Sequence, residues 1–336
     1  MRVRRLTIHG PRLAGLEDLE IPDEPLAPAE VLVRTRYSLI SPGTELAYYA
    51  GDQTLGHQAE PYPFYPGYAA VGEVLATGDA APVRQGDLVL AHTPHQTVAR
   101  FDSRSTVCVP LPRGLAPDVA PLARLAQVSA VSVRLMAARP GDRAAVTGLG
   151  LVGNLAAQLL RCAGLRVLGV EPLLERRALA QRCGIAETID PVVLQDGTDE
   201  SEGLLNSCAV VIECSGQDRG VLSALSLAAQ HGEVFLVGAA WKRRTEVVAA
   251  DVARPVFNKY LALRSGWEWQ IPRYGVGPSG SIARCTTWAL DCLHDGSLHA
   301  TGLITDRVPP EAAPDAYAHL LDHPDRHLGV LIEWSL

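Results

Sequence analysis

Hydrophobic and polar residues follow one rhythm from residue 1 to residue 121. Short apolar runs are separated by proline and glycine, as at Glu30–Thr35, Ala69–Leu75 and Asp87–Ala91. Short apolar runs between turn-forming residues are typical of β-strands in an all-β region. We therefore predict a β-rich domain in this part of the chain.

From residue 122 to residue 267, continuous apolar runs alternate with amphipathic helical stretches. Five of these runs are candidate strands: Ala144–Thr147, Val167–Val170, Val210–Cys214, Val234–Val237 and Leu261–Leu263. Apolar strands that alternate with helices predict an α/β domain with a doubly wound parallel sheet, covered by helices on both faces.

After residue 268 the pattern is mixed again, with a helix expected around Thr286–His294 and a last strand at Gly329–Glu333. We predict that residues 1–121 and 268–336 form one discontinuous β-rich domain. The α/β domain, residues 122–267, is then inserted between its two parts.

A glycine-rich motif, G-x-G-x-x-G, follows the first candidate strand of the α/β domain and precedes an amphipathic helix. This is the context that a dinucleotide-binding loop requires. Gly148 permits the tight turn, Gly150 lets the backbone approach a pyrophosphate, and Gly153 lets the helix pack against the strand. The first helical N–H groups, including those of Leu151 and Val152, would then bind the phosphates.

An acidic residue, Glu171, stands at the end of the next candidate strand, about 20 residues beyond the loop. A carboxylate there accepts hydrogen bonds from the adenosine ribose and repels a 2′-phosphate, which favours NAD(H) over NADP(H). Arg176 and Arg177 lie just downstream and could pair with such a phosphate, so NADP(H) stays open.

Composition narrows the range of partners. The chain has 336 residues, enough for two domains, and a formal net charge of −7, which argues against nucleic acid. No apolar run reaches the length of about 18 residues that a membrane-spanning helix needs, and no leader is visible, so we expect a cytoplasmic protein. Seven scattered cysteines without a C-x-x-C pair indicate reduced thiols rather than a disulfide framework. The expected partner is a small-molecule substrate.

Several motifs together resemble the medium-chain dehydrogenase/reductase superfamily, the zinc-type alcohol dehydrogenases. The matching segments cover nearly the whole chain: residues 30–34, 41–45, 66–74, 86–89, 148–153, 211–216 and 232–238. The resemblance implies a GroES-like catalytic domain, a Rossmann domain and a cleft between them. It also implies a homodimer paired through the region from Ser265 to Pro278. Further cofactor contacts that it implies are Ser215, Gly238, Ser265 and Gly266.

The zinc ligands of the superfamily are missing from their usual positions. Where zinc-dependent relatives read C-G-T-D, the chain reads Pro42–Glu45, and where they read G-H-E it reads Gly67–Ala69. A third ligand position aligns with Ala123, and the four-cysteine structural lobe is reduced to Cys108. Because zinc requires three or four Cys, His or carboxylate ligands, we predict an enzyme without metal.

Hydrogen-bond donors must then replace the Lewis acid. By resemblance, Thr44 occupies the position of the hydroxyl that contacts the substrate oxygen, Tyr68 stands where a metal ligand stood, and His92 lies near a strand end that lines the pocket. These three are the candidate catalytic residues. Alternatively, Tyr68 only fills the vacated metal cavity, and His92 is a solvated loop residue.

Candidate substrate contacts are Glu45, Tyr48, Tyr65 and Trp267. Glu45 matches a position that supports the metal site in zinc enzymes, and Tyr65 belongs to the proline-stiffened aromatic segment 61–66. For Tyr65 and Trp267, local packing is the alternative to a role in the pocket.

The patterns S-x-I-S-x-G-T-E and P-G-Y resemble a metal-free branch of the superfamily that includes bacteriochlorophyllide dehydrogenases. The first hypothesis is a zinc-independent NAD(P)(H) oxidoreductase that interconverts a secondary alcohol and a ketone. The polar substrate would be a keto-sugar, an aminocyclitol or a natural-product intermediate, and reduction would be the easier direction. The alternatives are a quinone or enone reductase and a non-catalytic NAD(H)-binding sensor or scaffold.

Overall fold

The computed structural model describes residues 1–52, 62–195, 198–239, 245–277 and 280–334. The chain falls into two compact units: unit 1 is Met1–Leu125, Pro272–Gly296 and Gly302–Leu336, and unit 2 is Ala126–Ile271 and Ser297–Thr301. The units differ from the predicted domains at residues 122–125 and 268–271, which lie on the other side of each boundary, and at Ser297–Thr301.

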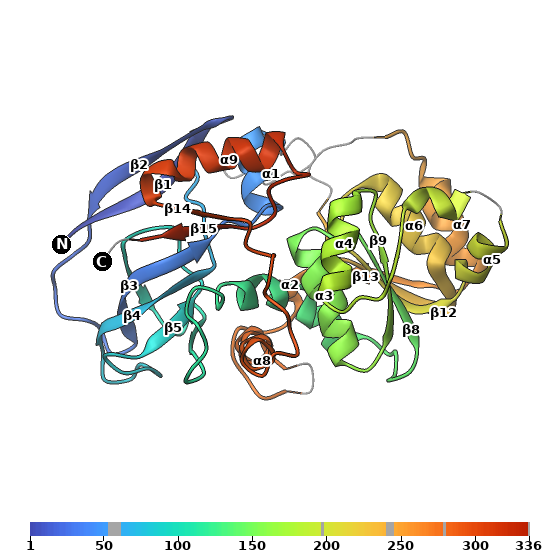
Figure 1. The fold of residues 1–336 in the computed structure, drawn as a ribbon. Coiled ribbons are helices and arrows are strands. Elements are labelled where there is room, and N and C mark those ends of the chain that lie inside the picture. Colours follow the sequence, from blue (N-terminus) through green and yellow to red (C-terminus); the bar gives the residue numbers. More distant parts are fainter. Residues whose placement is uncertain (53–61, 196–197, 240–244, 278–279, 335–336) are drawn as a thin grey trace. The chain divides into compact units, whose positions relative to one another are not determined.

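Unit 2 contains a six-stranded sheet in the order β10-β9-β8-β11-β12-β13, and every neighbouring pair is parallel (Figure 1). The strands are β8 (Arg143–Thr147), β9 (Arg166–Val170), β10 (Glu187–Ile189), β11 (Cys208–Glu213), β12 (Ala228–Leu236) and β13 (Ala262–Ser265). All five predicted strands are present, and β10 is an additional one.

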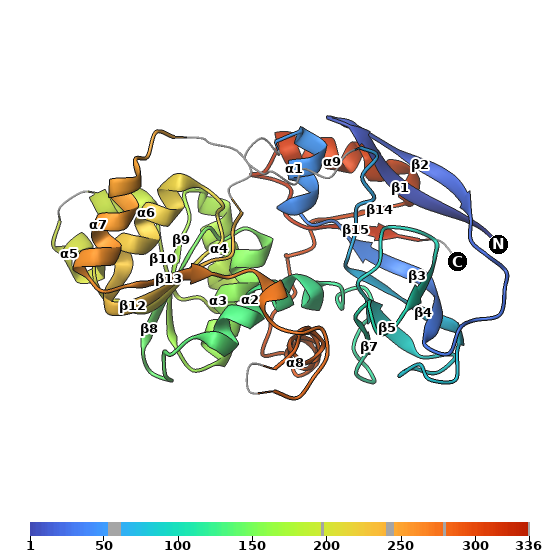
Figure 2. The same ribbon diagram turned by 180° about the vertical axis from the view of Figure 1, so that it is seen from behind.

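Both faces of this sheet are covered, as the apolar strands predict. Ala145 and Val211 pack in a cluster with residues of α6 and α7. Their neighbours Val146 and Ile212 point to the opposite face and are also fully buried. The helices are α2 (Leu122–Leu135), α3 (Leu151–Cys162), α4 (Leu174–Arg182), α5 (Asp199–Leu204), α6 (Asp218–Leu227) and α7 (Ala249–Asn258), with a 3₁₀ turn η1 (Pro191–Gln195) (Figure 2).

The strand order of this sheet reverses at β8. Strands β9 and β10 follow on one side of β8, whereas β11, β12 and β13 follow on the other. Ligands of doubly wound sheets bind outside the carboxyl ends of the strands at such a reversal. The glycine-rich loop directly follows β8, so the fold places it there.

Unit 1 contains a seven-stranded sheet with the path β14-β15-β3-β4-β5-β7, in which β6 also pairs with β3. The strands are β3 (Glu30–Leu39), β4 (Ala70–Thr77), β5 (Leu88–Ala91), β6 (Val98–Asp102), β7 (Cys108–Pro110), β14 (Asp306–Val308) and β15 (Val330–Glu333). In Figure 1 the red strand β15 lies beside the blue strand β3, so the two ends of the chain share one sheet.

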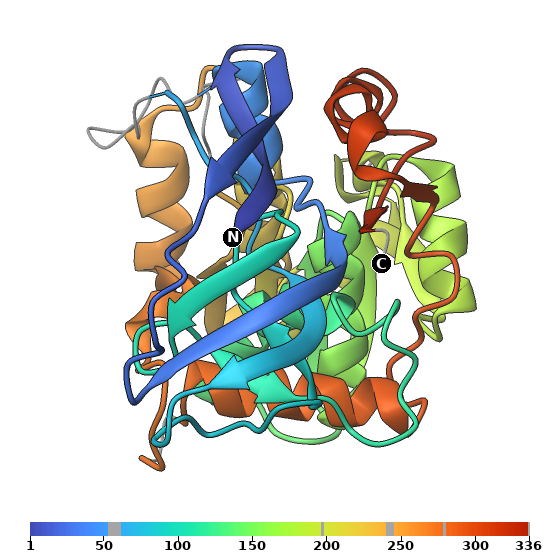
Figure 3. The ribbon, with the colours of Figure 1, turned by 90° about the vertical axis from the view of Figure 1, so that its left-hand side faces the viewer.

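A separate hairpin, β1 (Arg2–Gly10) and β2 (Leu13–Glu20), stands above the long blue strand β3 in Figure 3. The helices of unit 1 are α1 (Thr44–Ala50), α8 (Ile282–His294) and α9 (Ala313–Asp322), with a 3₁₀ turn η3 (Pro310–Ala312); η2 (Glu268–Gln270) belongs to unit 2. Leu6 and Ile8 of the hairpin pack with Tyr317 of α9 and Ile332 of β15. The hairpin, α1 and α9 are elements that the sequence analysis did not predict.

Candidate functional site

The glycine-rich loop has no room for side chains at two of its three glycines. Gly148 has a positive φ of 83°, and a Cβ there would lie 2.7 Å from the backbone nitrogen of Ser215. A Cβ on Gly153 would lie 1.8 Å from the carbonyl oxygen of Gly148. At Gly150 the nearest atom to a Cβ would be Nη1 of Arg176, at 3.6 Å. The loop is therefore closely packed at its two ends and has space at Gly150.

Helix α3 begins at Leu151, and its N-cap residue Gly150 provides no side-chain hydrogen bond. The first N–H groups of the helix, including those of Leu151 and Val152, therefore have no capping side chain. Such groups, with the partial positive charge of the helix end, suit a pyrophosphate. The residues present fit the dinucleotide that the motif implies.

Glu171 lies directly beneath this loop and is only 3% exposed. Its Oε2 accepts a hydrogen bond of 2.8 Å from the backbone N–H of Leu149, and its Oε1 accepts one of 3.1 Å from Leu173. Each carboxylate oxygen has two lone pairs, so capacity for ribose hydroxyls is left. The geometry holds the carboxylate against the loop.

The two arginines after Glu171 lie in different surroundings. Nη1 of Arg176 is 3.9 Å from Oε2 of Glu171 and beside Gly150. Nη1 of Arg177 instead donates to the carbonyl oxygens of Glu171 and Pro172 and to Asp190. Of the two, Arg176 is the one placed next to the glycine-rich loop.

Glu213 organises the carboxyl end of β11 and was not singled out from the sequence. It is fully buried, and its carboxylate accepts hydrogen bonds from the N–H of Ser215, at 2.7 Å, and from the Ser215 hydroxyl. Burial raises the pKa of Glu213. The sequence could have identified Glu213, because it is the only acidic residue in the motif at residues 211–216.

The remaining predicted cofactor residues lie at neighbouring strand ends of unit 2. A Cβ on Gly238 would lie 2.2 Å from the nitrogen of Gly216, and a Cβ on Gly266 would lie 2.4 Å from Cγ2 of Val237. Ser265 is the last residue of β13, and its Oγ accepts a hydrogen bond of 3.0 Å from the N–H of Trp267. The predicted cofactor residues thus lie at the carboxyl ends of the strands in this sheet.

In unit 1, Thr44 and Glu45 are the first two residues of α1. The carboxylate of Glu45 is fully buried and accepts hydrogen bonds from the Ser41 N–H, at 3.0 Å, and the Tyr317 hydroxyl, at 2.5 Å. Its Oε2 also lies 3.0 Å from Nε2 of His95. Any effect of Glu45 on a substrate must therefore pass through one of these partners.

His95 extends this buried network, although the sequence analysis did not name it. Nδ1 of His95 is 2.8 Å from Oγ of Ser38, which also accepts a hydrogen bond of 2.8 Å from Nε1 of Trp334. Burial, followed by the charge of Glu45, raises the pKa of Tyr317 well above its usual range. The network fixes the segment that leads into α1.

Tyr68 lies next to the start of α1. Its hydroxyl donates a hydrogen bond to Oγ of Ser41, and the Arg124 guanidinium carbon lies 4.4 Å from the centre of its ring. Arg124 is 2% exposed. Tyr68, Ser41 and Arg124 thus form a cluster of polar groups beside Thr44.

His92 directly follows β5. The residue is partly exposed, but both of its ring nitrogens are buried. Neither nitrogen has a hydrogen-bond partner among the residues that the structure describes. Burial is the main cause that lowers the pKa of His92 well below its usual range, and the charges of Arg124 and Arg273 add to it. The imidazole is therefore neutral near pH 7.

The candidate substrate contacts are dispersed. Tyr48 is buried in α1, and its ring stacks on Phe64 with centres 3.8 Å apart. Tyr65 is exposed beneath the guanidinium of Arg5, at 3.6 Å. Trp267 is 67% exposed and belongs to unit 2, whereas Thr44, Glu45 and Tyr48 share helix α1. Pro61 of the aromatic segment lies outside the described residues.

The donor set does not fit a zinc ion. Within the described ranges, no group of three His, Cys, Asp or Glu side chains is placed to hold a metal. The aligned positions carry Pro42, Tyr68 and Ala123. Burial, with the nearby carboxylate of Asp87, raises the pKa of Cys108 to about 12, so this thiol is a poor source of a thiolate ligand.

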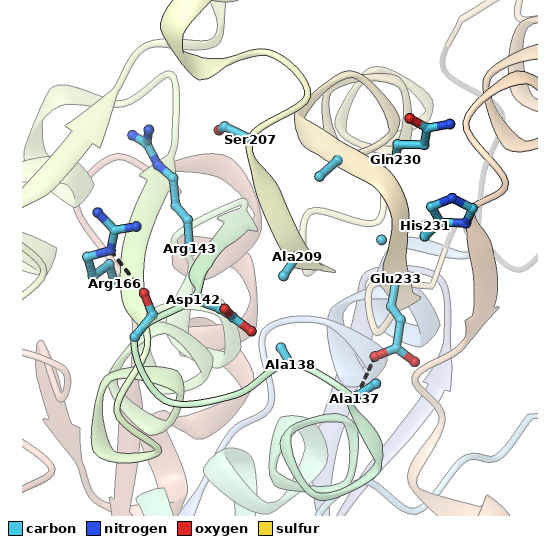
Figure 4. Close-up of a pocket in the computed structure, with 13 residues that line it drawn as sticks. Ala137, Ala138, Asp142, Arg143, Arg166, Ser207, Ala209, Gln230, His231 and Glu233 are labelled. Carbon is cyan, nitrogen blue, oxygen red and sulfur yellow. Dashed lines mark hydrogen bonds between the residues drawn. The ribbon is translucent and has the colours of Figure 1, made fainter.

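A cavity of about 430 Å³ lies elsewhere in unit 2, where β8, β9 and β11 begin (Figure 4). Charged groups that line it already have protein partners. Arg143 pairs with Glu187, Arg166 donates to the carbonyl of Gly141, and Glu233 accepts from the N–H of Ala137. Because the glycine-rich loop follows the carboxyl end of β8, this cavity is not the dinucleotide site.

The helices within the described ranges are all too short or too polar to span a membrane.

Comparison with known proteins gives consistent matches. A family model described as zinc-binding dehydrogenase matches residues 152–267. The chain is 29% identical to 2-desacetyl-2-hydroxyethyl bacteriochlorophyllide A dehydrogenase of Cereibacter sphaeroides over 99% of both proteins. It is 26% identical to D-guloside 3-dehydrogenase of Escherichia coli K12 over 97% of this chain and 98% of that protein.

Among solved structures, a zinc-binding dehydrogenase of Sinorhizobium meliloti 1021 bound to NADP superimposes with a TM-score of 0.78. The identity is 18%, and the match covers 99% of each chain. This likeness confirms the predicted fold class, a Rossmann doubly wound sheet with a GroES-like β-rich part.

Proposed function

We propose that the protein is a zinc-independent NAD(P)(H) oxidoreductase that interconverts a secondary alcohol and a ketone. The proposal starts from the chain's membership of the medium-chain dehydrogenase/reductase superfamily. The relatives named above are dehydrogenases that act on alcohol groups, and this chain is an enzyme of the same kind. The observation that carries the proposal is the glycine-rich loop, where Gly148 and Gly153 leave no room for a Cβ beside the buried Glu171.

The nicotinamide cofactor supplies or accepts a hydride when it is bound. In this chain, the N–H groups of Leu151 and Val152 would hold its pyrophosphate, and Glu171 would accept hydrogen bonds from the adenosine ribose. We favour NAD(H), because the fixed carboxylate of Glu171 repels a 2′-phosphate. NADP(H) stays a second possibility, because Arg176 lies beside Gly150.

The proton of the reaction is assigned to Tyr68, assisted by Thr44. The Tyr68 hydroxyl is oriented by its hydrogen bond to Ser41, and Thr44 follows Ser41 by three residues at the start of α1. In reduction, such a hydroxyl gives a proton to the substrate oxygen, and in oxidation it takes one back. His92 is neutral and serves as a hydrogen-bond donor rather than as a strong acid.

The donor set, rather than any missing ion, supports the proposal of zinc independence. Pro42 and Ala123 carry no ligand atom, and a neutral phenol such as Tyr68 is not one of the Cys, His or carboxylate ligands that zinc sites use. We propose reduction of the ketone as the direction of use, because the protonated Tyr68 hydroxyl can give its proton to the forming alkoxide in place of a metal. The substrate class that we propose is a polar ketone: a keto-sugar, an aminocyclitol or a natural-product intermediate.

We also propose a homodimer. Strand β13 is at the edge of the six-stranded sheet, and pairing with a second copy would cover that edge. Static light scattering at micromolar concentration would give the mass of two chains. A mass of one chain would contradict the proposal.

The test of function is NADH and NADPH oxidation by the purified full chain with a panel of keto-sugars, aminocyclitol ketones, enones and quinones. We expect turnover with polar ketones, less than stoichiometric zinc by elemental analysis, and no loss of activity with a chelator. Turnover of enones and quinones alone would identify the reductase alternative. NADH binding without turnover of any compound would favour a sensor or scaffold.

A further inference from the structure

We propose that Glu213 is a positioning residue of the dinucleotide site: its buried carboxylate holds residues 215–217 in the conformation that receives the nicotinamide half of the cofactor. The inference rests on the proposed function and deepens it, because it assigns a residue outside the glycine-rich motif to cofactor binding. Every residue that carries the inference belongs to unit 2.

The first observation is that hydrogen-bond donors of one short segment surround the Glu213 carboxylate. Its Oε1 accepts from the N–H of Ser215, at 2.7 Å, and from the Ser215 hydroxyl. Its Oε2 accepts from the N–H of Gly216, at 3.3 Å. Oγ of Ser215 in turn accepts a hydrogen bond of 3.2 Å from the N–H of Gln217, the N-cap residue of α6. One buried side chain therefore fixes this segment, partly directly and partly through Ser215.

The second observation is the close contact of this segment with two neighbouring loops. A Cβ on Gly148 would lie 2.7 Å from the backbone nitrogen of Ser215, and a Cβ on Gly238 would lie 2.2 Å from the nitrogen of Gly216. The carbonyl oxygen of Glu213 also accepts a hydrogen bond of 2.8 Å from the N–H of Gly238. Any shift of the segment would therefore change its packing against both the glycine-rich loop and the loop after β12.

The third observation is the position of β11 in the sheet. In the proposed function, Glu171 after β9 binds the adenosine ribose, and the start of α3 after β8 binds the pyrophosphate. The strand order is β9-β8-β11, so Glu213 lies on the side of β8 opposite to Glu171. A dinucleotide whose pyrophosphate lies at the end of β8 therefore extends its nicotinamide half toward the ends of β11 and β12.

A carboxylate suits this place better than an amide of the same shape. Ser215 and Gly216 donate to both oxygens of Glu213, and a carboxylate accepts at both. A glutamine would turn an NH₂ group toward one of these donors, because an amide has only one oxygen. Glu213→Gln should therefore displace the segment without leaving a cavity, since the two side chains are nearly equal in size.

The test compares NADH with ADP, which carries the adenosine and both phosphates but no nicotinamide. Dissociation constants for the two ligands are measured by calorimetry on the full chain. In Glu213→Gln, we expect the NADH affinity to fall at least about tenfold and the ADP affinity to change by less than about twofold. Glu233→Gln is the matched control and should leave both affinities unchanged, because Glu233 is a second largely buried glutamate of unit 2 and lines the cavity where β11 begins (Figure 4).

A second pair of variants keeps the carboxylate and disturbs its partner. Gly220 lies in α6, and a Cβ there would lie 2.0 Å from Oγ of Ser215 and 2.7 Å from Oε1 of Glu213. Gly220→Ala should push the Ser215 hydroxyl out of its hydrogen bond and weaken NADH binding by about threefold or more, with ADP binding unchanged. Gly203→Ala is the control, because a Cβ on this exposed glycine of α5 would meet no described atom within 4 Å. Thermal unfolding shows that each variant is folded, and Gly220→Ala decides the question if Glu213→Gln does not fold.

Equal losses of NADH and ADP affinity in Glu213→Gln would reduce the residue to a general structural role and overturn the inference. Unchanged NADH affinity in Glu213→Gln, or in Gly220→Ala, would overturn it as well. Failure of the proposed function has a different signature. If the loss is selective for NADH but no ketone oxidises NADH, the positioning role stands and the oxidoreductase assignment falls. If ketones are reduced and Glu213→Gln binds NADH like the wild type, the function stands and the positioning role falls.

Discussion

Glu45 and His95 form a completely enclosed pair, with Oε2 of the carboxylate 3.0 Å from Nε2 of the imidazole and neither side chain exposed. Ser41 and Tyr317 also donate to the carboxylate. The Glu45 carboxylate has three hydrogen-bonding partners, so its lone pairs are well used. If the side chain of Glu45 were removed, each of these buried partners would lose its acceptor. The pair therefore holds the approach to α1 in place.

Glu45→Gln should lower the free energy of unfolding by about 3 kcal/mol, because an amide cannot accept from all the donors that face it. Urea denaturation of the full chain measures this loss. Glu311→Gln is the matched control, since Glu311 is an exposed partner of Arg4 and its ion pair should contribute less than about 1 kcal/mol. Equal effects of the two substitutions would contradict the structural role of Glu45.

Gly150→Ala and Gly153→Ala should behave differently. Gly150 has space for a methyl group, so Gly150→Ala should fold normally but weaken NADH binding by about tenfold, because the methyl group would stand where the pyrophosphate approaches. Gly153→Ala would force a methyl group into the Gly148 carbonyl and should cost more than about 3 kcal/mol of stability. Thermal unfolding and fluorescence titration with NADH separate the two effects. Normal NADH affinity in Gly150→Ala would place the cofactor elsewhere.

Glu171→Ala should shift the preference from NADH toward NADPH by at least about tenfold, through loss of ribose hydrogen bonds and relief of repulsion. Arg176→Ala in the same chain should reverse part of the shift, because Arg176 lies beside Gly150. Arg177→Ala is the comparison, since Arg177 is engaged with the carbonyls of Glu171 and Pro172. Affinities for both cofactors measure the outcome. A wild type that already prefers NADPH, unchanged by Glu171→Ala, would exclude the predicted ribose contact.

His92 should make the folded protein sensitive to acid. Its pKa is lowered in the folded state by burial and by the charges of Arg124 and Arg273, so the unfolded chain binds a proton more readily. Stability is therefore complete above the unfolded pKa of about 6.5 and falls below it, by up to about 1.4 kcal/mol per pH unit from this one group.

His92→Phe should flatten the acid side of the stability curve. Urea denaturation between about pH 5 and pH 7.5 would show a smaller slope for the variant than for the wild type. Parallel curves would mean that His92 titrates alike in both states.

Local patterns determined much of unit 2. The apolar strands Ala144–Thr147 and Val210–Cys214, and the glycine spacing at 148–153, can be recognised from a few neighbouring residues because burial on both faces removes polar side chains. The place of Glu171 was also predictable from the sequence. Strands β8 and β9 are parallel neighbours, so the residue after β9 lies beside the loop that follows β8.

Unit 1 depended on tertiary structure. Glu45 meets His95 fifty positions away and Tyr317 at the other end of the chain, and Ser38 meets Trp334 because β15 returns to β3. No local period records such encounters, since they are created when distant segments pair in one sheet. The sequence therefore determined the dinucleotide loop, whereas only the fold brought Glu45 to His95 and Tyr317, because long-range packing, not spacing, sets which polar groups are buried together.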